Sequence, residues 1–221
     1  MILKEDFTNL TMTETKSERR RPPLFELLGN VCLDFINTLD DRPSDKPNEL
    51  LKSYYDLARF GEDTGILTPE QLDYFFERVH LMPDEAEEAL RRAIRLREAM
   101  YAVFSAVTIQ QTVPPGAMDT LNAHIRNAAL HSRLVPRQGR MEWRFEDLGS
   151  AFDAMLWPIA RAAADLLASS DLALVRACSS PTCQWLFLDT SKNHHRRWCS
   201  MKSCGNRAKV RKFYAKKRSS A

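Results

Sequence analysis

The sequence predicts a mainly α-helical fold, with a helical N-terminal domain and a small C-terminal module. Two observations predict it: apolar residues recur at helical spacing from Leu24 to about Ser170, and the charge of the chain changes after Asp189. Of 32 basic and 29 acidic residues, eleven basic and no acidic ones follow Asp189, so residues 1–189 carry a net charge of −8. We therefore expect an N-terminal mobile arm at 1–23, a helical domain at 24–170 and a C-terminal domain at 171–221.

The helical domain divides into several expected helices. Thr68-Pro69-Glu70-Gln71 marks one start, with an N-cap, a proline at the first helical position and a glutamine at the third. Pro83 begins the longest helix, and Pro114-Pro115 follows its end. A short strand is expected over residues 141–145. The expected helices span residues 25–39, 48–66, 69–81, 84–110, 115–131 and 149–169.

A polar stripe interrupts the apolar pattern of the first of these helices. At 100° per residue, apolar side chains cover about 240° of its circumference and leave Asn30, Asp34 and Asn37 on a narrow polar stripe. Arg97 falls on the buried stripe of the longest helix, where an unpaired guanidinium would be very unfavourable. The favoured interpretation is a structural ion pair between Asp34 and Arg97. The alternative is a pocket for a small-molecule effector, lined by Asn30, Asp34, Asn37 and Arg97.

Composition excludes several classes of protein. Hydrophobic residues make up 44% of the chain and charged residues 28%, which is typical of globular rather than disordered proteins. No apolar run approaches the ~18 residues of a membrane span, and the first ten residues include Glu5 and Asp6 where a signal peptide would have an apolar core. We expect a cytoplasmic protein with no membrane association.

No catalytic residue is predicted. Cys32 lies among apolar residues with no histidine near it in sequence, so it is expected in the core. The glycines of the body form no phosphate-binding loop, and no nucleophile–base pair or open metal site is visible. We expect a protein that is not an enzyme; an enzymatic or ligand-binding role of the helical domain is kept as an alternative.

The other four cysteines follow the pattern C-x4-C-x15-C-x4-C and are Cys178, Cys183, Cys199 and Cys204. Two close pairs separated by about fifteen residues are typical of a structural zinc site, because each pair brings two thiolates to one metal from a tight turn. Disulfides are the alternative, and a chain without secretion signals disfavours them. We expect one structural Zn²⁺. Between the pairs, residues 184–189 and 196–199 are expected to form a hairpin around a turn at 190–193.

A basic helix is expected after the last cysteine, over residues 205–218. Val210, Phe213 and Tyr214 fall within one 100° arc and are expected to cover the hairpin. Ala208 and Ala215 form the outermost line, with arginines on one flank and lysines on the other. A helix of this shape, about 21 Å long, suits the major groove of DNA.

Two parts of the sequence, given below, resemble known bacterial families. Residues 178–187, with the sequence CSSPTCQWLF, and residues 204–207, with the sequence CGNR, resemble the CGNR zinc-finger family. Residues 28–38 (LGNVCLDFINT) and 96–99 (LREA) are similar to the ABATE domain that usually precedes this finger. The resemblance covers about residues 24–217. It implies a stress-related transcription regulator, with the four matched cysteines as zinc ligands.

The leading hypothesis is a DNA-binding transcription regulator whose helical domain senses an effector, contacts proteins or forms a homo-oligomer. An RNA- or ribosome-associated protein is the alternative, with Trp185, Trp198, Phe187 and Tyr214 stacking on unpaired bases if exposed. The residues expected on DNA are Arg207, Lys209, Arg211 and Lys212 of the helix, with Arg196 and Arg197 on flanking phosphates.

Overall fold

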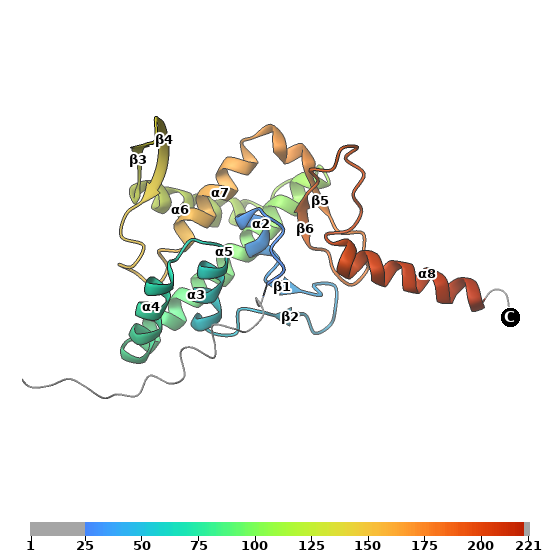
Figure 1. Ribbon diagram of the computed structural model, residues 1–221, viewed down its shortest axis with the longest axis horizontal. Helices are drawn as coiled ribbons and strands as arrows, with labels where there is room; N and C mark the ends of the chain where they lie inside the picture. Colours follow the sequence, from blue (N-terminus) through green and yellow to red (C-terminus); the bar gives the residue numbers. More distant parts are fainter. Residues whose placement is uncertain (1–24, 219–221) are drawn as a thin grey trace, which may run out of the picture.

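The computed structural model describes residues 25–218, and the arm expected at 1–23 lies outside them. Figure 1 shows a helical body from which α8 extends at one end. The mainly α fold with a small C-terminal β region is confirmed. The helices of the body are α2 (Val31–Ile36), α3 (Tyr54–Asp63), α4 (Pro69–Leu81), α5 (Pro83–Thr108), α6 (Pro115–Leu130) and α7 (Leu156–Leu167). The C-terminal elements are η1 (Ser170–Leu174), β5 (Val175–Ala177), β6 (Leu186–Leu188), η2 (Met201–Gly205) and α8 (Asn206–Arg218).

The long helix α5 is the centre of the body and packs against α2, α3, α4, α6 and α7. Its inner face alternates small and large buried residues, such as Ala93 and Phe104, which lets neighbouring helices approach closely. Val175 of β5 and Leu186 of β6 belong to the same hydrophobic core. Part of the C-terminal region is therefore packed into the helical body, and the domain division expected near residue 170 stays a prediction.

Three of the expected helices begin later than the apolar pattern suggested. The helix expected at 25–39 is reduced to α2, whose N-cap is Asn30; its side-chain oxygen accepts the Leu33 N–H. The helix expected from residue 48 begins at Tyr54, because Ser53 and Asp56 form a reciprocal capping box. Residues before it instead form a short antiparallel ribbon of β1 (Leu39–Asp40) and β2 (Asn48–Glu49).

The helix expected at 149–169 begins only at Leu156. Pro158 explains the difference, because proline lacks an N–H and is tolerated only in the first turn of a helix. The other expected helices, including the start at Pro69 with its capping box, agree with the structure to within two residues at each end.

The expected strand at 141–145 exists, and its partner was missed. β4 (Arg140–Phe145) pairs antiparallel with β3 (Ser132–Arg137) in a protruding hairpin. Gln138 and Gly139 join the strands with φ values of 47° and 78°, the left-handed conformation that two-residue hairpin turns require. Among the described residues, no helix is both long and apolar enough to cross a bilayer.

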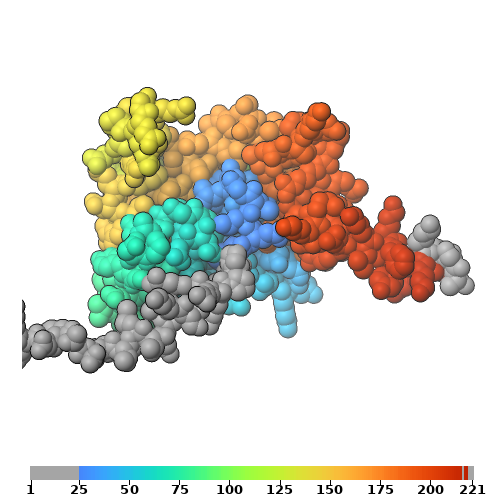
Figure 2. Space-filling model, in the orientation of Figure 1, coloured from blue at the N-terminus to red at the C-terminus, as the bar shows by residue number. Residues whose placement is uncertain are grey.

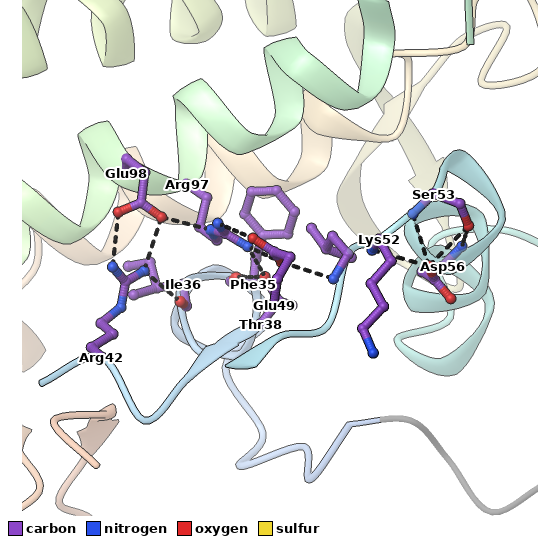
Figure 3. Close-up of polar contacts among 11 residues, drawn as sticks. Phe35, Ile36, Thr38, Arg42, Glu49, Lys52, Ser53, Asp56, Arg97 and Glu98 are labelled. Carbon is purple, nitrogen blue, oxygen red and sulfur yellow. Dashed lines mark hydrogen bonds and ion pairs between the residues drawn. The ribbon is translucent and has the colours of Figure 1, made fainter. Parts of the chain in front are cut away.

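Arg97 is buried on α5, with 2% of its side chain exposed, and its partners come from the segment after α2 and from α5 itself. Its guanidinium binds Glu49 of β2 through both terminal nitrogens, at 2.6 and 2.7 Å, and its Nε donates to Glu98 at 2.8 Å. Glu98 in turn accepts two hydrogen bonds from Arg42 (Figure 3). Two buried cations are thus neutralised by two carboxylates that are partly exposed.

The ion pair expected between Asp34 and Arg97 is wrong. Asp34 accepts the backbone N–H groups of Leu28 (2.7 Å) and Gly29 (3.1 Å), while Arg97 uses the network just described. The helical pattern correctly identified both side chains as buried and polar, but it could not show which faces of the two helices meet. Glu49 was missed because it was assigned to a helix and not to the strand that crosses α5.

Replacing Arg97 tests whether this network holds the fold. We expect Arg97→Ala to lower the free energy of unfolding by about 2–3 kcal/mol, because it removes the charge-assisted hydrogen bonds to Glu49 and leaves Glu98 with Arg42 alone. Arg91→Ala is the matched control: Arg91 also lies on α5 and pairs with Glu87 and Glu88, but on the exposed face, so little change is expected. Urea denaturation followed by circular dichroism measures both. Equal effects of the two substitutions would contradict the assignment.

Candidate zinc centre and nucleic-acid interface

The four cysteines outside the helical core converge at one point. Their sulfur atoms all lie within 4.8 Å of one another, and all four residues are buried. Cys199 Sγ lies 3.7 Å from both Cys183 Sγ and Cys204 Sγ. In a tetrahedral site with Zn–S bonds of about 2.3 Å, the sulfur atoms stand about 3.8 Å apart. The cluster therefore has the spacing of a four-thiolate zinc site.

The electrostatics of the cluster also call for a cation. Hydrogen bonds from Cys183 and Cys199 lower the pKa of the Cys178 thiol, whereas the proximity of Cys178 raises the pKa of Cys183 and of Cys199. Further thiolates are thus unfavourable without a counter-charge, and a divalent cation supplies it. Cys32 is different: burial raises its pKa, and its thiol donates to Asn30 Oδ1, so it stays a neutral core thiol as expected.

Short elements position the four sulfurs in what we call the cysteine module, residues 175–205. Cys178 directly follows β5, and Cys183 closes a turn through its N–H to the Ser180 carbonyl. Cys199 lies just before η2, and Cys204 lies within it. The expected hairpin is corrected here: β6 pairs antiparallel with β5, upstream of the first cysteine, and not with residues 196–199. Those residues form no strand.

Asp189 explains why the returning segment is not a strand. Its buried carboxylate accepts the N–H and hydroxyl of Ser191 on one oxygen and the N–H of Arg196 on the other. The Arg196 N–H, which a strand ladder would use, is thereby committed to a side chain. The last acidic residue of the chain is thus a structural residue of the cysteine module, a role that the sequence pattern did not reveal.

Two of the six expected nucleic-acid contacts point into the module. The Arg196 guanidinium lies over the Phe187 ring, 4.6 Å from its centroid, and donates to the carbonyls of Trp198 and Cys199. Arg207 donates to Cys204 Sγ at 3.0 Å, where it offsets thiolate charge. Both side chains support the metal site directly.

Arg207 is nevertheless exposed, as are the remaining four expected contacts. Arg197 lies over the Trp198 ring at 5.3 Å and is open to solvent. Lys209, Arg211 and Lys212 are exposed on α8. Figure 2 shows α8 as an arm that extends from the body. The helix carries seven basic and no acidic residues among its 13, so it concentrates positive potential away from the acidic body.

One expectation about α8 is wrong. Val210, Phe213 and Tyr214 were expected to cover the cysteine module, but they are 54%, 65% and 58% exposed. The core of the module is already filled by the cysteines and Phe187, with Leu28, Trp185 and Trp198 packed against it. Among the described elements, α8 packs mainly against η2, which precedes it.

The polar stripe of α2 joins the body to the cysteine module. The Asn37 amide donates to the Leu186 carbonyl at 2.9 Å and accepts the Leu186 N–H at 3.0 Å, so it pairs with β6 as another strand would. On α5, the Tyr101 hydroxyl donates to Gln184 at 3.2 Å. Asn30, Asp34, Asn37 and Arg97 are thus each bonded to protein groups, which favours the structural interpretation over an effector pocket.

A four-thiolate centre packed on a helical body, with a cationic helix after it, defines a zinc-finger protein. The CGNR zinc-finger family matches residues 175–217. The ABATE family, described as "Putative stress-induced transcription regulator", matches residues 29–170. The chain therefore belongs to the ABATE family and ends in a CGNR zinc finger that holds one structural zinc. No curated protein matches the chain. The resemblance inferred from the cysteine pattern is confirmed.

Metal content tests the site. We expect one zinc per chain, and we expect Cys199→Ala to abolish tight binding because three thiolates leave the tetrahedron incomplete. Cys32→Ala is the matched control, since it also removes a buried thiol but should retain one zinc. Elemental analysis of purified protein measures both. Chelation should unfold the cysteine module while most helical circular dichroism remains; a zinc-free finger with native near-ultraviolet signal would contradict this.

The pH dependence of stability tests the buried carboxyl of Asp34. Burial raises its pKa to about 6, although the N–H groups of Leu28 and Gly29 oppose that shift. Because the unfolded carboxyl has a lower pKa, protonation favours the folded state, and this contribution is lost as the pH rises through about 6.

We compare wild type with Asp34→Asn, which cannot titrate, so that other groups cancel. Between about pH 7.5 and about pH 5, the stability of wild type relative to the variant should rise by about 1 kcal/mol. Thermal or urea unfolding at each pH measures the difference. A constant difference across this range would show that Asp34 keeps an ordinary pKa.

Proposed function

We propose that this protein is a cytoplasmic DNA-binding transcription regulator in which the zinc finger fixes the base of α8 and α8 contacts the DNA backbone. The observation that carries the proposal is the exposure of Lys209, Arg211 and Lys212 on a helix with no acidic residue. Phosphate contacts of this kind supply much of the affinity of a protein for DNA. Arg197, at the edge of the finger, adds a fourth exposed cation.

The basic residues have two different roles, and this supports the same proposal. Arg196 and Arg207 are engaged by the finger itself, so they hold the helix in position for residues further along it. About four phosphate contacts are then available, fewer than the sequence suggested. The expected slope of log K against log salt on duplex DNA is about −3 to −4.

The helical domain is proposed to act through protein contacts. Its polar stripe is satisfied internally, so a ligand pocket there is the weaker candidate. The acidic character of the body, with a net charge of −8 over residues 1–189, disfavours a second nucleic-acid surface and directs DNA to α8.

Charge removal on α8 tests the proposal. The triple variant Lys209→Ala, Arg211→Ala, Lys212→Ala should weaken duplex binding at least about tenfold and flatten the salt slope by about one per residue removed. The matched control removes three exposed arginines elsewhere: Arg126, Arg140 and Arg144, on α6 and the β3–β4 hairpin. Fluorescence anisotropy at several salt concentrations measures both. Equal loss in the two triple variants, or an affinity independent of salt, would rule the proposal out.

A further inference from the structure

The aromatic face of α8 is exposed and also holds Lys217. At 100° per residue, Val210, Phe213 and Tyr214 share one arc, while Ala208, Arg211 and Lys212 lie on the opposite side. The Phe213 and Tyr214 rings contact each other edge to face, with centroids 5.6 Å apart. More than half of each side chain is exposed. Large apolar side chains that gather on a projecting element mark a contact surface.

We propose that this surface stacks on unpaired bases, so that α8 binds nucleic acid with an accessible single strand. This rests on the proposed function and specifies its substrate class. The charge of the helix selects a polyanion, because α8 carries seven basic residues and no acidic residue. Among polyanions, nucleic acid also presents flat apolar faces, the bases, on which aromatic rings stack.

Base pairing decides between the forms of nucleic acid. In an intact duplex the faces of the bases are covered by their neighbours, and only their edges are open in the grooves. A single strand, an RNA loop or an opened region of DNA exposes the faces and carries phosphates close by. The aromatic pair therefore contacts bases, while Lys209 and Lys217, which lie beside the rings on the helix, bind phosphates of the same strand.

Other aromatic residues of the finger do not compete for this role. Phe187 is fully buried, and Trp185 and Trp198 are partly buried against the finger core. Of the aromatic residues named at the outset as candidates for stacking, only Tyr214 is exposed, and the structure adds Phe213. A second copy of α8 is disfavoured as the occupant, because two helices without acidic residues repel each other.

The test compares an oligothymidine single strand with a duplex of mixed sequence, using the full-length zinc-loaded protein. The variant Phe213→Leu, Tyr214→Leu keeps apolar bulk and helix propensity but removes both rings. We expect it to bind the single strand about tenfold more weakly, with duplex affinity and both salt slopes unchanged. Ultraviolet cross-linking should join wild-type Phe213 or Tyr214 to thymine. Unchanged zinc content and melting temperature verify that the variant is folded.

The control variant Tyr74→Leu removes an exposed ring from α4 of the helical body, and it should bind both probes as wild type does. The proposal is overturned if the ring variant binds the single strand as wild type does, or loses affinity equally for both probes. It is also overturned if sedimentation shows a dimer that the ring variant abolishes, since a second copy then covers the face. Failure of the proposed function is seen separately, as duplex binding that is insensitive to removal of Lys209, Arg211 and Lys212.

Discussion

The buried guanidinium of Arg97 is the constraint on which much of the structure depends. A cation with 2% exposure must be neutralised in place, and its carboxylates come from two elements, Glu49 on β2 and Glu98 on α5. Glu98 also binds the guanidinium of Arg42, which lies over the Tyr101 ring. The Tyr101 hydroxyl in turn donates to Gln184 of the zinc finger. One buried charge therefore connects the β1–β2 ribbon, the central helix and the finger.

The zinc finger has an anchored side and a free side. On the anchored side, β5 and β6 contribute Val175 and Leu186 to the core of the body, and Asn37 completes the edge of β6. On the free side, four thiolates replace the hydrophobic core that so short a segment could not build. The finger thus serves as a rigid base from which α8 extends, which places its cations and its aromatic pair where a large partner can approach (Figure 1).

Several features were readable from the sequence because they depend on neighbours along the chain. The start of α4 follows from a capping box and a proline at its first position. Pro158 and Ser53 are equally local signals for the starts of α7 and α3. The expected starts were nevertheless placed too early, because they followed the spacing of apolar residues. The partners of Arg97 and Asp34 were not readable, because periodicity places a side chain on a face but does not show what that face meets.

By itself, the sequence determined the metal site and the sign of the charge on the binding surface. Spacing of the four cysteines fixes local turns, and net charge is additive along the chain whatever the fold. Only the tertiary structure decided which basic residues bond within the finger: Arg196 donates to the Trp198 carbonyl and Arg207 to Cys204 Sγ, whereas Lys209, Arg211 and Lys212 are exposed on α8. It also decided that the apolar face of α8 is open. Interior space is limited, and which side chains fill it depends on residues that are distant in sequence. In the finger, the cysteines and Phe187 fill the interior, so the apolar residues of α8 lie outside it.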